Sequence, residues 1–403
     1  MASSIPAPKR LPVATNGIML IHVDFLITGI VMTFIGPMLP ILAARWSLTD
    51  AQSGSLIFVQ FFSSMFGMLV SGISVQRQGY RFTLIVGALL MASGMALLAS
   101  GSWGMGIAAV SILGVGYGIT TPAGNLRTAE INPKSSASAL NVVNAVWGIG
   151  AMSSPFLVAI AQREHRPAYF LYGTAAVLLV LLLALMLTRF VPDTHAHAEA
   201  GLRNKSFWSN GALPLICALF FIYVGTETAF GAWIATYGRR VDSRARVLAT
   251  VTPSFYWGAL LVGRALAPVA LRFRSAVTIA RAGLSVALLG GFTLVAAHKI
   301  ELVVVGAVLA GLGLASIFPI SVSLLPAWFG PSTRRASGAI FASGNIGGAT
   351  LPWFVGEISS HTAGLRIAFL VPLLGVSAML VFYLTNKASA DPQGTKAPDL
   401  LIN

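Results

Sequence analysis

The chain has 403 residues, of which 56% are hydrophobic and only 9% charged, and its mean hydropathy is +0.80. A soluble domain carries about 25% charged residues, so this composition excludes a water-soluble globule. The apolar runs are continuous, as in Val177–Leu187 and Leu302–Leu314, whereas strands of a membrane barrel alternate apolar and polar residues. The composition therefore indicates an all-α membrane protein.

The net charge of +14 does not indicate nucleic-acid binding, because the basic residues are scattered over short loops rather than gathered in one domain. More of these residues fall on the side of the two termini, which is the positive-inside pattern when both termini are cytoplasmic. The basic loop 239–246 is an exception on the other side. We therefore expect a multi-pass protein of a bacterial inner membrane with both termini in the cytoplasm.

About twelve apolar stretches follow one another between Gly17 and Asn386, each of the roughly 20 residues that a helix needs to cross the hydrocarbon. In chain order, we expect spans over residues 17–43, 51–75, 82–101, 104–128, 137–162, 167–190, 211–237, 248–271, 276–297, 300–328, 335–358 and 364–386. The polar tails 1–13 and 388–403 are expected to be disordered. These boundaries predict a bundle over residues 14–190, a cytoplasmic linker over 191–210 and a second bundle over 211–387.

Two sequence patterns occur twice, with six spans between the copies. Gly114-x-Gly116-x5-Pro122 of the fourth span returns in the tenth as Gly311-x-Gly313-x5-Pro319. Gly150-Ala151-x3-Pro155 of the fifth span returns in the eleventh as Gly347-Gly348-x3-Pro352. The repeat predicts two pseudo-symmetric six-helix bundles, an arrangement in which transporters hold the substrate between the halves near the middle of the membrane.

Ionisable side chains inside a membrane are costly, so each one is a functional candidate. Asp24 lies within the first span and Glu227 within the seventh, its symmetry mate. A carboxyl group in a low dielectric can bind and release a proton near neutral pH, or ligate sodium, so both are candidates for cation coupling. The alternative is a structural ion pair of either acid with Arg264 of the eighth span, and we assign Arg264 a structural role.

Polar side chains also recur at helical spacing, which places them on common helix faces. Amides donate to and accept from hydroxyl groups, and aromatic rings cover the C–H face of a sugar ring, so these faces suit a polyhydroxylated substrate. The alternative is that such residues only join helices by hydrogen bonds. The candidate substrate-binding residues are Gln60, Thr121, Asn125, Asn141, Asn144, Tyr223, Glu227, Asn345 and Trp353.

Nothing in the sequence indicates a cofactor or an enzyme. There is no phosphate-binding loop, no zinc-protease helix motif and no nucleophile elbow. His195-x-His197 in the linker could bind a metal, but two histidines in a polar loop are far more often solvated, so we expect no metal site.

The loop between the second and third spans identifies a family resemblance. Gly72-x4-Arg77-x-Gly79-x-Arg81 resembles the loop signature of the major facilitator superfamily, and Trp257-Gly258-x4-Gly263-Arg264 is similar in style. The resemblance implies structural or gating roles for Gly72, Arg77, Gly79, Arg81 and Arg264. The acid usual in this signature is replaced by Gln76, which puts the family's salt-bridge latch in doubt.

Three segments resemble the fucose/glucose/galactose permease branch of that superfamily: Gly116–Asn125 with Asn141–Asn144, Tyr223–Glu227, and Ser316–Pro319 with Gly347–Pro352. The acids of fucose permeases fall at Thr33 and Thr121 here, so proton coupling at those positions is not implied. Either Asp24 and Glu227 perform it, or the protein couples to sodium or works as a uniporter.

We therefore predict a monomeric secondary transporter that moves a sugar or similar small polar solute by alternating access, coupled to H⁺ or Na⁺ symport. Its partners would be the substrate, the coupling cation and membrane lipid, with no nucleic acid. The rival hypotheses are an exporter of amphipathic compounds and, from a different class, a membrane sensor or enzyme.

Overall fold

The computed structural model describes residues 14–132, 135–188, 211–362 and 364–385, and all regular structure within them is helical. The predicted tails 1–13 and 388–403 and the linker 191–210, with His195 and His197, lie outside the described residues. The N-terminal bundle consists of α1 Ala14–Thr33, α2 Ile35–Trp46, α3 Asp50–Ser100, α4 Trp103–Ile131, α5 Ser136–Arg163 and α6 Pro167–Leu187. The C-terminal bundle consists of α7 Ala212–Val241, α8 Arg246–Ala270, α9 Ala276–Ala296, α10 Ile300–Leu314, α11 Ile317–Phe329, the 3₁₀ turn Gly330–Ser332, α12 Thr333–His361, α13 Leu365–Ala368 and α14 Leu370–Thr385.

The helix α3 contains two membrane passes rather than one. Its backbone leaves the helical region at Gly79, where φ is +84°. Gly67, before this point, packs against Val115 of α4. Gly87, after it, packs against Gly116, the next residue of α4. In a straight helix, residues 67 and 87 would be about 30 Å apart, so the chain must reverse at Gly79. The predicted spans 51–75 and 82–101 are the two limbs of α3.

Prolines break three of the spans that the sequence predicts to be continuous, namely 17–43, 300–328 and 364–386. Proline has no N–H for the carbonyl four residues before it, and its ring collides with that carbonyl. For Pro37, Pro319 and Pro372 these carbonyls belong to residues 33, 315 and 368, at or next to the ends of α1, α10 and α13. The break between α1 and α2 bends the chain by 43°.

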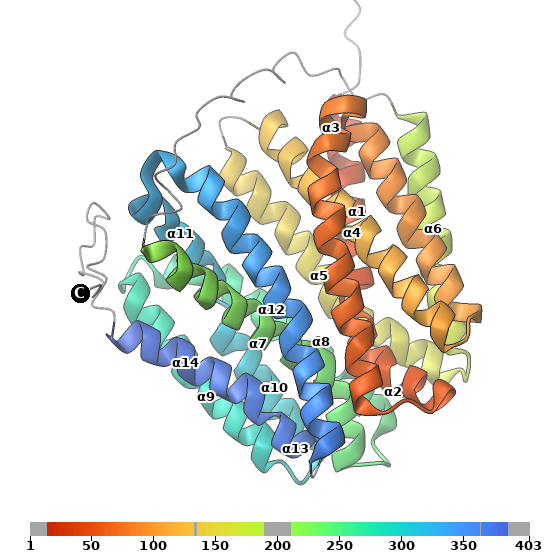
Figure 1. The fold of residues 1–403 in the computed structure, drawn as a ribbon, viewed down its shortest axis with the longest axis vertical. Coiled ribbons are helices and arrows are strands. Elements are labelled where there is room, and N and C mark those ends of the chain that lie inside the picture. The colour runs from red at the N-terminus through yellow and green to blue at the C-terminus, as the bar shows by residue number, and fades with distance from the viewer. Residues whose placement is uncertain (1–13, 133–134, 189–210, 363, 386–403) are drawn as a thin grey trace, which may run out of the picture.

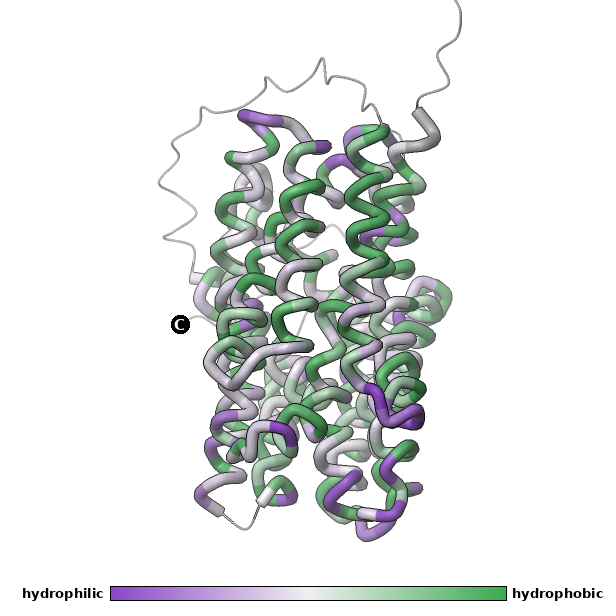
Figure 2. The backbone as a smooth tube through the Cα atoms, turned by 90° about the vertical axis from the view of Figure 1, so that its right-hand side faces the viewer, coloured by the Kyte–Doolittle hydropathy of each residue, from purple (hydrophilic) through white to green (hydrophobic). Residues whose placement is uncertain are grey.

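The protein is an integral, multi-pass membrane protein. Among the described residues, eight helical segments are long and apolar enough to cross a membrane, with Ile300–Pro326 and Leu365–Thr385 counted as one segment each, and there are nine if the bent pair α1 and α2 counts as one span. The second limb of α3 adds a pass, and the long helices α8 and α12 contact the other bundle through Thr250 and Ser359. Large apolar side chains such as Leu183 and Leu187 of α6 are exposed, as lipid contact requires. In Figure 2 the strongly hydrophilic stretches lie mostly at helix ends and turns.

Each bundle fixes its last helix by the same device. Arg81 near the start of the second limb of α3 donates from Nε to the Leu185 carbonyl oxygen at the end of α6, at 3.0 Å, and from Nη2 to that of Met186. Arg281 of α9 donates from Nε to the Tyr383 carbonyl oxygen at the end of α14, at 2.8 Å. A cation at a helix C-terminus satisfies free carbonyl groups and interacts favourably with the helix dipole.

The two bundles lie side by side in Figure 1, the N-terminal one red to yellow-green and the C-terminal one green to blue. They meet through α2 on α7, α5 on α8, and α3 on α12. The ion pair and the shortest hydrogen bonds between the described parts of the bundles lie at one end of the molecule, which we name the closed end, although α3 and α12 also meet farther along, where the Asn345 amide lies 3.5 Å from the Met68 sulfur. The closed end contains Asp50, Gln162, Arg240, Thr250 and Ser359.

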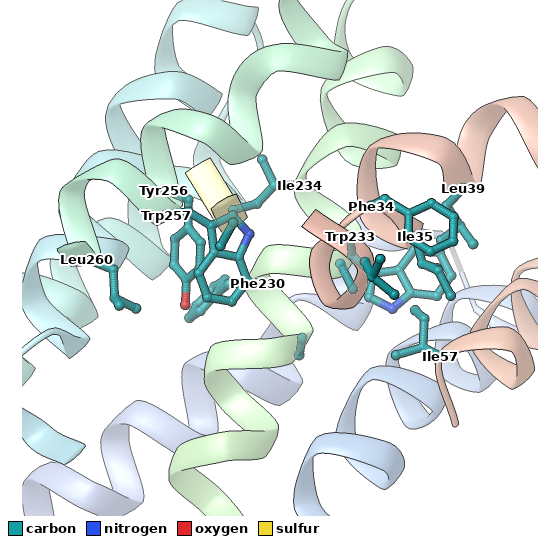
Figure 3. Close-up of a cluster of buried hydrophobic side chains, with 14 of the residues drawn as sticks. Phe34, Ile35, Leu39, Ile57, Phe230, Trp233, Ile234, Tyr256, Trp257 and Leu260 are labelled. Atoms are coloured by element: carbon teal, nitrogen blue, oxygen red, sulfur yellow. The ribbon is translucent and has the colours of Figure 1, made fainter. Parts of the chain in front are cut away.

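At the closed end, the surfaces where the two bundles meet are tightly packed. Trp233 of α7 is fully buried and lies beside Phe34, Ile35 and Ile57 of the other bundle (Figure 3). A Cβ atom added to Gly36 would lie 2.6 Å from the carbonyl oxygen of Gly231. This end therefore depends on apolar packing and on close backbone approach.

Candidate binding site between the two bundles

An ion pair lies midway along the helices of the C-terminal bundle. The Arg264 guanidinium of α8 donates to the Glu227 carboxylate of α7 at 2.7 Å and to the Tyr223 hydroxyl at 3.1 Å. The two charged side chains are 30% and 12% exposed, so the pair is accessible on one side. Tyr223 and Glu227 are one helix turn apart, which places both on the face of α7 that meets Arg264.

The N-terminal bundle presents its own polar groups opposite this pair. The Tyr117 hydroxyl of α4 lies near Thr121 and near Trp147 of α5, without hydrogen-bond geometry to either, and it is within electrostatic range of the Glu227 carboxylate across the interface. The Thr121 hydroxyl and the Trp147 indole N–H make no hydrogen bond in the structure. Polar groups that are buried without a partner are uncommon in folded proteins, and they indicate a place for a ligand or water.

Amide side chains extend this row of polar residues away from the closed end. The Asn144 side-chain amide of α5 donates to the Leu140 carbonyl oxygen at 2.7 Å and reaches the Asn125 amide oxygen of α4 at 3.4 Å. Asn141 and Asn144 are both exposed. The amide groups therefore lie at the exposed end of this row of polar residues and retain free donors and acceptors.

Two indole rings lie at the other end of this row of polar residues, on the side of the closed end. Trp147 and Trp257 come from different bundles, and their rings meet edge to face with centroids 6.1 Å apart. Trp257 is only 8% exposed, yet neither indole N–H has a hydrogen-bond partner. Figure 3 shows Trp257 beside Tyr256 and Phe230 in the buried cluster. Arg264 also lies 5.9 Å from the ring centre of Phe318.

These residues form one group, which we name the central polar cluster. It joins four helices of two bundles, and its members are Tyr117, Thr121, Asn125, Asn144, Trp147, Tyr223, Glu227, Trp257 and Arg264. The cluster offers one carboxylate, one guanidinium, two amides, several hydroxyls and two indole donors. Its single acid is balanced by its single cation, so it is neutral overall.

Three predicted binding residues lie elsewhere. Gln60 is buried, and its amide donates to the Val31 carbonyl oxygen at 3.1 Å, which links α3 to α1. The Asn345 amide of α12 donates to the Phe341 carbonyl oxygen at 3.1 Å. The Trp353 ring packs near the Phe58 ring, with centroids 6.1 Å apart. The same Asn345 amide lies 3.5 Å from the Met68 sulfur of α3, so in this conformation all three side chains contact other helices and not the central polar cluster.

Asp24 is fully buried, and neither of its carboxyl oxygens has a hydrogen-bond partner. It lies on α1, which packs mainly against α5 of its own bundle, and the central polar cluster does not include it. An isolated charged carboxylate is very costly in such surroundings, so the group is neutral in this conformation. Among the described residues, no group of three potential ligands could hold a metal ion.

The family-type loop has a structural explanation in part. Gly79 provides the positive φ of the chain reversal, and Arg81 caps α6. Gly72 has no atom within 4 Å of the place of a Cβ, and Arg77 is exposed. Gating roles for Gly72 and Arg77 remain predictions.

The sequence analysis missed three residues of the cluster. Tyr117 stands one helix turn before Thr121, Trp147 stands three residues after Asn144, and Trp257 stands two turns before Arg264. Helical spacing from the residues already selected could have found all three, because each lies on the same face as its neighbour.

Known proteins resemble the whole chain. A glucose/galactose transporter of Brucella abortus is 25% identical over 413 residues, covering 95% of this chain and 98% of the relative. The glucose/mannose transporter GlcP of Bacillus subtilis is 23% identical over 381 residues, covering 88% of this chain and 92% of the relative. The crystal structure of the fucose:proton symporter FucP of E. coli has 18% sequence identity and a TM-score of 0.61, covering 92% of this chain and 98% of that chain.

The fold confirms the predicted two-bundle architecture, because it is shared with these solved transporters. The family profile described as Major Facilitator Superfamily matches residues 25–294, which is more than half of the chain. With its repeated bundles and its reversal at Gly79, the chain belongs to the Major Facilitator Superfamily.

Proposed function

We propose that the protein transports a neutral sugar, in the size class of a hexose, and that the central polar cluster is its binding site. The observation that carries the proposal is the partly exposed Glu227–Arg264 pair, which is within electrostatic range of Tyr117 of the other bundle, the neighbour of the unpartnered Thr121 and Trp147. A carboxylate beside a guanidinium offers an acceptor and a donor to neighbouring hydroxyl groups. Because the pair has no net charge, it favours a polyhydroxylated ligand over an ionic one.

The rest of the cluster has the composition of a sugar site. Asn125 and Asn144 both donate and accept, and the indole N–H groups of Trp147 and Trp257 only donate. The aromatic rings provide apolar faces for the C–H side of a pyranose. A binding site for amphipathic drugs would be mainly apolar, with few such polar groups.

The relatives support the same substrate class. The Brucella and Bacillus proteins are named for transport of glucose with galactose or mannose, and they match this chain over nearly its full length. The FucP structure, a fucose:proton symporter, shares the fold. These likenesses place sugars first among the substrates to be tested.

We infer that transport proceeds by alternating access in the inner membrane of a bacterium, with the protein as a monomer. The Asp50–Arg240 ion pair and the Thr250–Gln162 hydrogen bond join the bundles at the closed end, while Asn141 and Asn144 are exposed away from it. A rocking motion of the bundles would open the closed end and expose the central polar cluster to the other side.

We propose that a cation, H⁺ or Na⁺, drives accumulation. Asp24 is the better candidate, because its buried carboxyl group has no partner and can accept or release a proton when the bundles rearrange. The Glu227 carboxylate is paired with Arg264, so we assign it to substrate binding in preference to cation coupling.

Counterflow of radiolabelled hexoses in proteoliposomes tests the substrate. Saturable exchange of at least one hexose, abolished in Glu227→Gln, is expected because this variant replaces the anionic acceptor by a neutral amide and leaves the Arg264 charge unbalanced. Clear uptake of another solute class, with no exchange of any sugar, would refute the sugar assignment.

The coupling is tested separately with Asp24→Asn. We expect this variant to keep hexose exchange and to lose accumulation against a gradient, and its response to imposed proton and sodium gradients identifies the ion. Accumulation at the wild-type level would exclude Asp24 from coupling.

A further inference from the structure

A cavity lies away from the central polar cluster, at the end of the N-terminal bundle that forms part of the closed end. It has a volume of about 470 Å³ and lies among α2, the end of α3 and the start of α6. Its walls include the apolar side chains of Met38 and Leu42, and its rim carries Arg45, His165 and Arg166. The cavity therefore combines an apolar wall with a cationic rim.

The two arginines are held in place without neutralisation. Arg45 donates to the Ala99 carbonyl oxygen at 2.9 Å and stacks 5.6 Å from the centre of the Trp46 ring. Arg166 donates to the Tyr169 hydroxyl and stacks 5.0 Å from the centre of the Tyr169 ring. Within the described part of the chain, neither forms an ion pair with a carboxylate. Both keep guanidinium N–H groups for an anion.

His165 reaches the rim through an unfavourable backbone conformation. His165 follows the C-terminus of α5 and has a φ of +55°. The Arg166 N–H donates to the Ala161 carbonyl oxygen, and the His165 N–H donates to that of Gln162. These two bonds form a Schellman motif, which usually has glycine at the position of His165. The matching connection in the other bundle, between α12 and α13, uses Gly364 for its positive φ. A histidine where glycine fits without steric cost indicates that the imidazole has a use.

Tyr169 lines the cavity, and two tryptophans lie near it, since Trp46 follows Arg45 and contacts Trp103. Trp46 and Trp103 meet edge to face with centroids 5.9 Å apart, and Tyr169 is exposed beside the rim. Tryptophan and tyrosine gather where a membrane helix passes the lipid headgroups. The cationic rim therefore lies at headgroup depth, and the apolar wall lies below it.

We propose that this cavity binds the headgroup of an anionic phospholipid. Arg45, Arg166 and the His165 imidazole donate to the phosphate oxygens, and the first carbons of an acyl chain follow the apolar wall toward the middle of the bilayer. Guanidinium groups match phosphate oxygens in geometry as well as charge. A free phosphate ion would leave the apolar wall uncovered, so the lipid is the better fit.

The C-terminal bundle has a counterpart cavity, of about 340 Å³, lined by Arg240, His298 and Arg366. There Arg240 is already bound to the Asp50 carboxylate. Because one of its two arginines is neutralised, this cavity is the weaker anion site and provides the matched control.

Native mass spectrometry of the detergent-purified full chain, with phosphatidylglycerol or phosphatidylcholine added, tests the proposal. We expect preferential retention of one phosphatidylglycerol molecule, and about five-fold weaker binding of it in Arg166→Gln, as the loss of one cation predicts. His165→Gly should also weaken binding while the protein remains as heat-stable as wild type or becomes more so. Arg366→Gln, in the counterpart cavity, should bind like wild type.

Equal retention of both lipids by the wild type would overturn the proposal, as would equal weakening in Arg366→Gln and Arg166→Gln, which would indicate a general effect of surface charge. Wild-type binding in both Arg166→Gln and His165→Gly would also overturn it. Displacement of the lipid by millimolar inorganic phosphate would show a free-anion site and refute the lipid assignment.

Discussion

Asp50 and Arg240 join the two bundles at the closed end through a two-pronged ion pair. Two guanidinium nitrogens donate to the two carboxylate oxygens, at 2.5 and 2.7 Å, between residues from α3 and α7. The Ser359 hydroxyl of α12 donates to the same carboxylate at 2.5 Å. One carboxylate thus connects three helices, two of which belong to the other bundle.

Replacing the acid should weaken the closed end. In Asp50→Asn the charge-assisted bonds are lost, and since Arg240 is 46% exposed we expect a cost of only about 1 kcal/mol, or roughly a five-fold shift toward opening. Spin labels on Arg163→Cys and Arg244→Cys in a Cys217→Ser background would report a longer distance between the bundles.

Glu357→Gln is the control for that measurement. Glu357 is near the same end of α12, but its described ion pair is with His361 of its own helix. A distance distribution that shifts equally in both variants would mean that the Asp50–Arg240 bond does not hold the bundles together.

Backbone approach should matter as much as the ion pair. Gly36→Ala places a methyl group against the Gly231 carbonyl oxygen, and overpacking of this kind costs about 1–3 kcal/mol in the closed form. The same spin labels should show a larger open population. Gly72→Ala, with open space at its Cβ, should leave the distances unchanged; a shift there would support a gating role for the loop.

The paired helix caps predict matched losses of stability. Arg81→Ala and Arg281→Ala each remove a charged hydrogen bond to a terminal carbonyl, and we expect each to cost about 1–2 kcal/mol. Thermal unfolding in detergent would measure both, with exposed Arg77 as the control. If Arg77→Ala lowers the melting temperature as much as Arg81→Ala does, the capping explanation is wrong.

The unpartnered indoles predict a loss of affinity beyond any loss of stability. Trp257→Phe keeps an aromatic ring but removes the pyrrole part of the indole with its N–H, so the smaller ring costs some core packing and hexose binding should weaken about three- to ten-fold, as for one hydrogen bond. Isothermal calorimetry with the hexose found by counterflow would measure it. Trp353→Phe, away from the cluster, should bind normally; unchanged affinity in Trp257→Phe would show that the indole N–H does not contact substrate.

The architecture could be predicted because membrane spans and repeated glycine patterns are local signals. The repeat of Gly114 and Gly116 in Gly311 and Gly313 was enough to indicate two bundles, and the fold confirms them. The same signals did not reveal that proline breaks three spans. Pro122 and Pro155 lie inside unbroken helices, so a proline alone does not fix the outcome.

The site was harder to predict than the fold. Spacing along one helix selected Tyr223 with Glu227 and Asn125 with Thr121, but it could not show which helices face each other. For that reason Gln60 was selected as a binding residue, although its side-chain amide donates a hydrogen bond to α1. For the same reason Trp257 was missed. Whether an acid stands alone, as Asp24 does, or beside a cation, as Glu227 does, depends on contacts between distant parts of the chain.

The bend at Phe34 separates α1, which packs on α5 of its own bundle, from α2, which packs mainly on α7 of the other. If the bundles move apart as proposed, α2 must either leave α7 or turn with it about residue 34. The first span would then contain a hinge within the N-terminal bundle.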